Sequence, residues 1–266
     1  GAPMLIPPPR QIKALPIALI ATCHGVEMRE APNAAAAPIN QLSISGNACG
    51  PAALLNSCRA GNQSWQAAEK SLAGTTDKER LGQWIRRFGL RPSNTLRGKM
   101  RWNSGGMNVE DLVTAANEMS KPLYLPTLAL DDLFRRKGEK PAALLKRTRD
   151  SMDRSLARGF PPVLSLRRFV LRKGVWTPVQ GHFVTVTSLP RKLTKHETGF
   201  RFTYIDPWGG KRCEGFLKIA DQPVLSGDIA SSPCLVADVP MSNIGKKEIR
   251  RGELSVVVPA AVIGRW

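Results

Sequence analysis

The sequence of 266 residues is poor in aromatic side chains, histidine and acidic residues, and it has no long apolar run. Aromatic residues make up only 6%, which weakens the case for a platform that stacks single-stranded nucleic-acid bases. Three scattered histidines and five cysteines without a close pair give none of the spacings of a zinc site, and no cofactor is expected. No stretch approaches the roughly 20 apolar residues of a transmembrane segment.

Basic residues outnumber acidic ones by 39 to 21, so the formal net charge is +18 and the pI is about 10.3. Because the charge is dispersed rather than grouped in blocks, a solvated basic surface is the plainest interpretation. Such a surface also attracts polyanions, so an anionic partner or surface stays open. The sequence contains no specific nucleic-acid recognition motif.

The number of cysteines gives evidence about the cellular compartment, because disulfides form mainly outside the cytoplasm. Four of them besides Cys49 could form two disulfides, namely Cys23, Cys58, Cys213 and Cys234. Cys213 and Cys234 flank a strand-and-turn region and are the preferred pair, which slightly favours an extracytoplasmic or secreted protein. Cys58 follows Cys49 by nine positions on an expected helix, and a small buried hydrophobic role is favoured for it.

Periodicity and capping residues predict helices at about 50–60, 64–73, 77–88, 108–119 and 141–158. Strands are expected at 162–166 with an extension over 169–171, and at 182–187, 200–205, 234–239 and 254–258. Because the helices precede the strands, we expect an α+β fold. It would form a single domain over residues 41–266, with a helical half to about 160 and a β half from 161.

Residues 1–40 are expected to be an N-terminal extension. Its apolar run ALPIALIA (residues 14–21) follows Arg10 and Lys13 and has the form of a signal-peptide core. An early buried strand explains the same run equally simply, and we favour the strand.

The stretch Asn47-Ala48-Cys49-Gly50-Pro51 organises the functional argument. Proline is favoured at the first position of a helix, so Cys49 falls at or just outside a helix N-terminus. The unpaired N–H groups and the helix dipole there favour an anion, which makes a thiol a better nucleophile at neutral pH. We therefore predict that Cys49 is a cysteine nucleophile.

A cysteine nucleophile requires a base and a group that orients the base. His182 follows Gly181 at the start of a strand and is the best candidate, since His24 lies in the N-terminal segment and His196 in a charged loop. Asp206 ends the next strand, and antiparallel pairing of the two strands would bring it to His182. The alternatives are a half-buried structural histidine and a loop aspartate.

Gln41, eight residues before Cys49, is a candidate donor to the oxyanion of an acyl-transfer transition state. Asn40 and Asn47 are alternatives for that role. Trp208, in the turn after Asp206, would cover the His–Asp pair from water or simply pack the turn.

Three motifs then carry a resemblance: Gln41 with ACGPAAL, GHFVTVT, and YIDPWGG. Together they resemble the papain-like cysteine peptidases, and most of all the bacteriocin-leader-processing (double-glycine) peptidases and their stand-alone bacterial relatives. The resemblance covers residues 41–216. It implies that Cys49 is the nucleophile, His182 the base, Asp206 its orienting carboxylate and Gln41 the oxyanion donor.

The sequence departs from this family at three places. The CGSCW signature of the plant-type enzymes is absent. The interval from Gln41 to Cys49 is longer than the family pattern, and a basic loop at 188–199 lengthens the interval from His182 to Asp206.

The leading hypothesis is a cysteine peptidase that cleaves peptide bonds of a peptide or protein through an acyl-enzyme intermediate. An acyltransferase, transglutaminase or deamidase would use the same triad. A third hypothesis is a catalytically idle papain-like module that only binds.

Overall fold

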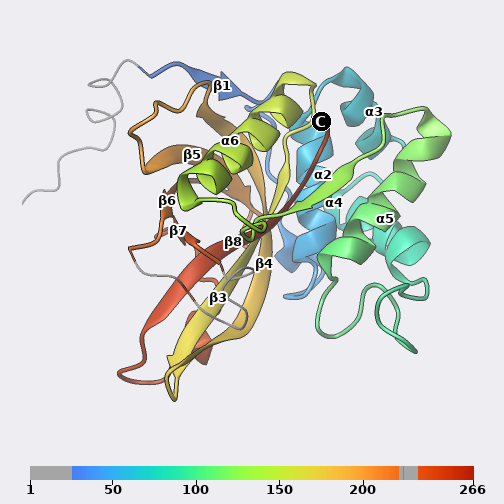
Figure 1. Cartoon of the computed structure of the whole chain (residues 1–266). Helices are drawn as coiled ribbons and strands as arrows, with labels where there is room; N and C mark the ends of the chain where they lie inside the picture. Colours follow the sequence, from blue (N-terminus) through green and yellow to red (C-terminus); the bar gives the residue numbers. More distant parts are fainter. Residues whose placement is uncertain (1–25, 222–223, 225–232) are drawn as a thin grey trace, which may run out of the picture.

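The computed structural model describes residues 26–221, 224 and 233–266, and it has the expected α+β fold (Figure 1). The N-terminal helices, including the one that carries Cys49, pack on a largely C-terminal antiparallel sheet. The helices are α2 (Cys49–Ala60), α3 (Gln63–Lys70), α4 (Asp77–Trp84), α5 (Val109–Ser120) and α6 (Pro141–Ala157). Short helical turns are η1 (Gln41–Ser43), η2 (Ile85–Gly89), η3 (Lys121–Leu123) and η5 (Lys246–Glu248).

The sheet has eight strands in the order β2-β8-β3-β4-β5-β6-β7, with β1 paired to β4 outside this path. All of the pairings are antiparallel. The strands are β1 (Met28–Glu30), β2 (Ala129–Asp132), β3 (Val163–Arg172), β4 (Val175–Pro190), β5 (Gly199–Asp206), β6 (Lys211–Ile219), β7 (Leu235–Asp238) and β8 (Ser255–Gly264).

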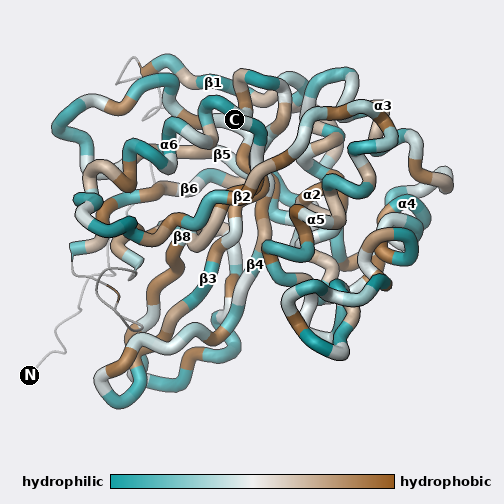
Figure 2. The backbone as a smooth tube through the Cα atoms, turned by 45° about the vertical axis from the view of Figure 1, so that its right-hand side comes forward, coloured by the Kyte–Doolittle hydropathy of each residue, from teal (hydrophilic) through white to brown (hydrophobic). Residues whose placement is uncertain are grey.

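Apolar side chains on both faces of the central strands hold the layers together. Along β3 and β4, Val163 and Phe183 belong to the core that contains α2 and α5, while Leu164 and Val184 belong to the core that contains α6. Successive side chains of a strand point to opposite faces, so α2 and α6 cover opposite sides of the sheet. Figure 2 shows the hydrophobic colouring concentrated where the central strands pass between these helices.

The start of α2 differs from that of its neighbours. Side-chain oxygens of Asn62, Thr76 and Asn108 cap α3, α4 and α5 by accepting backbone N–H groups. The residue before α2 is Ala48, which has no capping side chain. The first backbone N–H groups of α2 therefore have no capping acceptor and can donate to a group that lies beside Cys49.

All five predicted helices are confirmed, and the helix expected at 77–88 is α4 followed by the π-helical turn η2. The predicted strands are also confirmed, as parts of β3, β4, β5, β7 and β8. Three strands were not predicted. β1 and β2 are short edge strands, whose pairing with β4 and β8 defines them more than their own periodicity does. In β6, Gly215 and Phe216 interrupt the alternation that would reveal a strand. The strand expected over residues 14–21 lies outside the described residues.

The expected disulfide between Cys213 and Cys234 is wrong, because Cys49, Cys58, Cys213 and Cys234 are all free thiols. The register of β6 and β7 explains the error. Ala220 donates its N–H to the Cys234 carbonyl, so Cys234 lies at the end of β6 remote from Cys213. Seven residues of extended chain separate the two positions, roughly 20 Å. The expectation of an extracytoplasmic protein loses this support. Cys23 is not among the described residues.

Asn56 anchors the chain that leads to the nucleophile. Its Oδ1 accepts the N–H of Ile39 at 2.7 Å, its Nδ2 donates to the Ile39 carbonyl at 3.2 Å, and the side chain is buried.

Asn56→Ala would leave both backbone groups of Ile39 buried without a partner, so we expect a loss of about 3 kcal/mol in the free energy of unfolding. Urea unfolding measures this loss. Asn94→Ala, at an exposed position, is the control, with an expected change of less than about 0.5 kcal/mol. Equal stability of the two variants would contradict the anchoring role.

Candidate active site

Cys49 is the first residue of α2 and lines a cleft of about 710 Å³ together with His182. Close contacts hold the helix end against β4. Thr185 Oγ1 donates to the Ala53 carbonyl at 2.7 Å, three residues along β4 from His182. A Cβ at Gly50 would lie 3.4 Å from the Phe183 ring, so the small residue lets α2 approach the strand. The thiol is partly exposed to the cleft, which leaves it open to a reactant.

His182 and Asp206 come together as the sequence predicts. β4 and β5 pair antiparallel with Thr185 opposite Ile205, and His182 Nε2 lies 2.7 Å from Asp206 Oδ1. Both residues are buried, with 7% and 1% of their surface exposed. Because Nε2 faces the carboxylate, Nδ1 is the ring nitrogen left for Cys49, which lines the same cleft as His182.

The surroundings of His182 favour its charged form. Burial lowers its pKa, but the hydrogen bond to Asp206 and the proximity of Cys49 outweigh burial and raise the pKa to about 9. Burial alone would raise the pKa of Asp206, yet the hydrogen bonds from His182 and Ser242 bring it below its usual range. At neutral pH the site therefore holds an imidazolium beside a carboxylate.

Asp206 is held by further donors that the sequence analysis missed. Ser242 Oγ donates to Asp206 Oδ2 at 2.7 Å, and the Tyr204 hydroxyl lies 2.7 Å from the same Oγ. The backbone N–H of Trp208 donates to Oδ1 at 2.9 Å. Tyr204 precedes Asp206 by two positions on β5, so strand periodicity could have placed it on the same face. Ser242 is 36 residues away in the chain and carries no such signal.

Gln41 is buried and does not line the cleft of Cys49. Its Nε2 donates to the Gly46 carbonyl at 3.0 Å, and its backbone N–H donates to the Pro207 carbonyl at 2.9 Å. These bonds tie the segment before the nucleophile to the turn after Asp206. The role of Gln41 as an oxyanion donor stays a prediction.

The other two amides proposed for the oxyanion role are placed differently. Asn40 Oδ1 accepts the N–H of Gly209 at 3.0 Å, which adds a second link between the same segments. Asn47 lines the cleft, and its Nδ2 donates to the Asn103 carbonyl at 2.8 Å.

A loop before α5 forms the wall opposite the sheet. Trp102 Nε1 donates to the Asn47 carbonyl at 3.0 Å, so the loop is fixed to the turn that presents Cys49. Gly105 and Gly106 of this loop line the cleft, and Gly106 has a positive φ of 88° that favours glycine.

The groove continues past His182. A second cavity of about 590 Å³ shares Gln180, His182 and Trp208 with the Cys49 cleft, and Lys246 and Lys247 line its outer part. The Trp208 side chain is 42% exposed and lines both cavities, and a Cβ at Gly46 would lie 3.4 Å from its ring. His182 thus lies between the two cavities, one of which contains Cys49 and the other Asp206.

No protein-family model matches this sequence, and no curated protein is similar to it. In the described parts of the chain, no helix is both long and apolar enough to span a membrane. The same parts contain no cluster of histidine, cysteine and acidic side chains suited to a metal ion.

Alkylation tests the activation of Cys49. At pH 6 we expect iodoacetamide to modify Cys49 first, because it faces the cleft and the charged His182. Cys58 is fully buried and burial raises its pKa, so it should react last. Mass mapping of modified peptides measures the rates. His182→Ala should slow modification of Cys49, whereas His196→Ala, in the exposed loop, should leave it unchanged. Equal rates at Cys49 and Cys58 would exclude an activated thiol.

The ion pair predicts a histidine with unusual titration. The raised pKa means that His182 keeps its proton at neutral pH and loses it only as the pH rises through about 9. Asp206→Asn removes the carboxylate, so the titration should move to lower pH. NMR titration of the imidazole resonances, assigned with His182→Ala, measures both midpoints. Glu197→Gln, in the loop between β4 and β5, should not shift them. A His182 midpoint near 6.5 in the wild type would refute the charged pair.

Proposed function

We propose that the protein is a cysteine hydrolase that cleaves peptide bonds through Cys49, His182 and Asp206. One observation carries the proposal: Cys49 lines the same cleft as a buried imidazole, and a buried carboxylate holds Nε2 of that imidazole at 2.7 Å. This is the order of groups that nucleophilic catalysis by cysteine requires.

The reaction begins with attack of the Cys49 thiolate on the carbonyl carbon of the substrate. A C–S bond forms, and the carbonyl oxygen takes the negative charge. The backbone N–H of Cys49, at the uncapped start of α2, can donate to this oxyanion. The imidazolium of His182 then gives its proton to the leaving amine as the C–N bond breaks, which leaves a thioester on Cys49.

Hydrolysis of the thioester restores the enzyme. The neutral His182 takes a proton from water as the oxygen attacks the acyl carbon, and the C–S bond breaks to release the acid and the thiolate. Asp206 keeps the ring oriented and stabilises the imidazolium in both halves of the reaction.

The groove supports a peptide as the substrate. Cavities on both sides of His182 leave room for chain on either side of the reacting bond. Four glycines line the first cavity, and a Cβ at one of them, Gly181, would meet only the Leu166 carbonyl at 3.8 Å. Walls of this kind let an extended backbone approach closely.

The sequence motifs also support a cysteine peptidase. The stretches around Cys49, His182 and Asp206 resemble those of papain-like peptidases, and a nucleophile helix packed on an antiparallel sheet is consistent with that layout. A module that only binds has no chemical need for Cys49, His182 and Asp206 in this arrangement.

Incubation with a peptide library tests the proposal. We expect the wild type to cleave peptides and Cys49→Ala or His182→Ala to lose at least about 1,000-fold in rate. Cys58→Ala, which removes a buried thiol remote from the cleft, is the matched control and should retain activity. Mass spectrometry of the products gives the rates.

The same assay with an added amine separates the alternatives. An amine adduct without cleavage would replace hydrolysis by acyl transfer. Identical behaviour of the wild type and Cys49→Ala with every peptide would refute catalysis and favour a binding module.

A further inference from the structure

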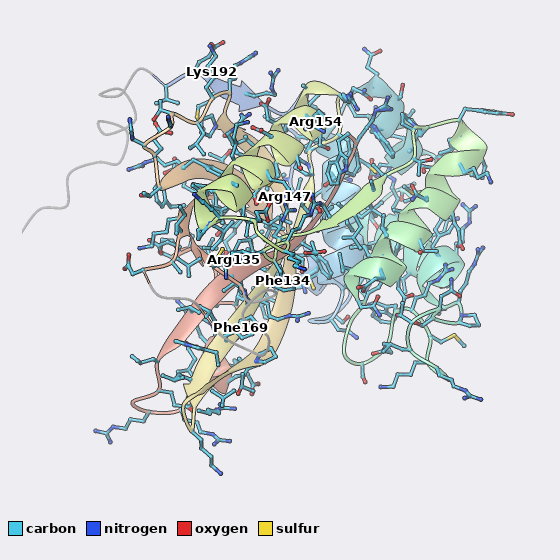
Figure 3. The ribbon with its side chains drawn as sticks, in the orientation of Figure 1. Phe134, Arg135, Arg147, Arg154, Phe169 and Lys192 are labelled. Atoms are coloured by element: carbon cyan, nitrogen blue, oxygen red, sulfur yellow. The ribbon has the colours of Figure 1, made fainter. Side chains whose placement is uncertain are left out.

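A separate cavity of about 560 Å³ is lined by residues of β3, β6, β7 and the start of β8. β3 and the start of β8 lie side by side in the lower part of Figure 1, and Figure 3 labels Phe169, the residue that follows Arg168 on β3. Neither Cys49 nor His182 lines this cavity. Two residues link it to the site described above: Ser242 lines it and donates to Asp206, and Lys246 also lines the second cavity beside His182.

Arg168 brings a buried charge to this cavity. Its residue is 8% exposed, its Nε donates to the Ile244 carbonyl and its Nη1 donates to Ser255 Oγ at 2.8 Å. Both partners are neutral. Asp221 and Asp238 also line the cavity, but both are exposed and neither forms an ion pair with Arg168. Burial without a nearby carboxylate lowers the pKa of Arg168.

The other buried arginines show what is missing at Arg168. Arg101 is paired with Glu118 at 2.7 Å, and Arg149 with Asp150 at 2.6 Å. No carboxylate among the described residues forms an ion pair with Arg168, although a buried charge without a counter-charge costs free energy.

The guanidinium also keeps free hydrogen-bonding capacity. Of its five N–H groups, two have protein partners, so three remain without one among the described residues. Its planar edge can donate two parallel hydrogen bonds, a geometry that matches a carboxylate.

The rest of the cavity combines an apolar wall with charged side chains, which include Lys246 as well as the two aspartates. Trp176, Val236, Val256 and Val257 form its walls, and Lys218 lies at its border as another cation. A volume of about 560 Å³ suits a small molecule or one terminal residue of a peptide. A ligand that satisfies these walls has one anionic end and one compact apolar end.

We propose that this cavity binds a carboxylate attached to an apolar group, with Arg168 taking the carboxylate and Trp176 and the valines covering the apolar part. The C-terminal residue of a peptide and a medium-chain fatty acid share this chemistry.

Calorimetric titration with octanoate and N-acetyl-leucine tests the proposal, with octanamide and N-acetyl-leucinamide as neutral counterparts. We expect at least one acid to bind and its amide to bind at least 10-fold more weakly. Tighter binding of octanoate would indicate a fatty acid, and tighter binding of N-acetyl-leucine a peptide C-terminus. Equal binding of acid and amide, or no binding of either acid, would overturn the proposal.

Variants locate the bound acid. Arg168→Gln should abolish binding, and Arg154→Gln, an exposed arginine on α6, should not change it. Because Arg168 also forms hydrogen bonds with Ile244 and Ser255, the Arg168→Gln variant can unfold. Val256→Trp fills the cavity while Arg168 is kept, and it should also abolish binding. The alkylation rate of Cys49 reports whether each variant is folded. A folded Val256→Trp that still binds the acid would place the ligand elsewhere and refute the site.

Discussion

The buried hydrogen bond between His182 and Asp206 is the interaction on which the site depends. It crosses from β4 to β5, so it forms only when these strands pair in the observed register. Both groups are largely shielded from water, so each charge stabilises the other more strongly there than it would in solvent. The same burial would be costly to either group alone, which is why Ser242 and the N–H of Trp208 complete the coordination of the carboxylate.

The position of Cys49 depends on how α2 packs against the same strands. Thr185 bonds to Ala53 of the helix and Asn56 bonds to the chain before it, so the helix cannot slide along β4 without breaking buried polar contacts. Gln41 and Asn40 add links from the segment before Cys49 to the turn after Asp206. The thiol and the carboxylate are thus fixed to each other through two routes, one across the sheet and one around its edge.

The sequence predicted the parts of this arrangement that have local signals. Pro51 marks a helix start, alternation marks β4 and β5, and the shortage of histidines singled out His182. Tertiary contacts decided the rest. Ser242 and the Trp102 loop reach the site only through the fold, and no spacing in the chain announces them. The wrong Cys213–Cys234 pair has the same origin, because pairing depends on the register of β6 and β7.

The His182–Asp206 pair and the Arg168 cavity both contain buried charges that need compensating partners. Asp206 receives a cation and neutral donors, whereas Arg168 receives only neutral acceptors. Ser242 stands between them, since its hydroxyl bonds to Asp206 and its residue lines the Arg168 cavity. A carboxylate bound at Arg168 would therefore complete the compensation of the second charge without competing for the donors of the first. The fold can keep both charges buried because each faces a different cavity.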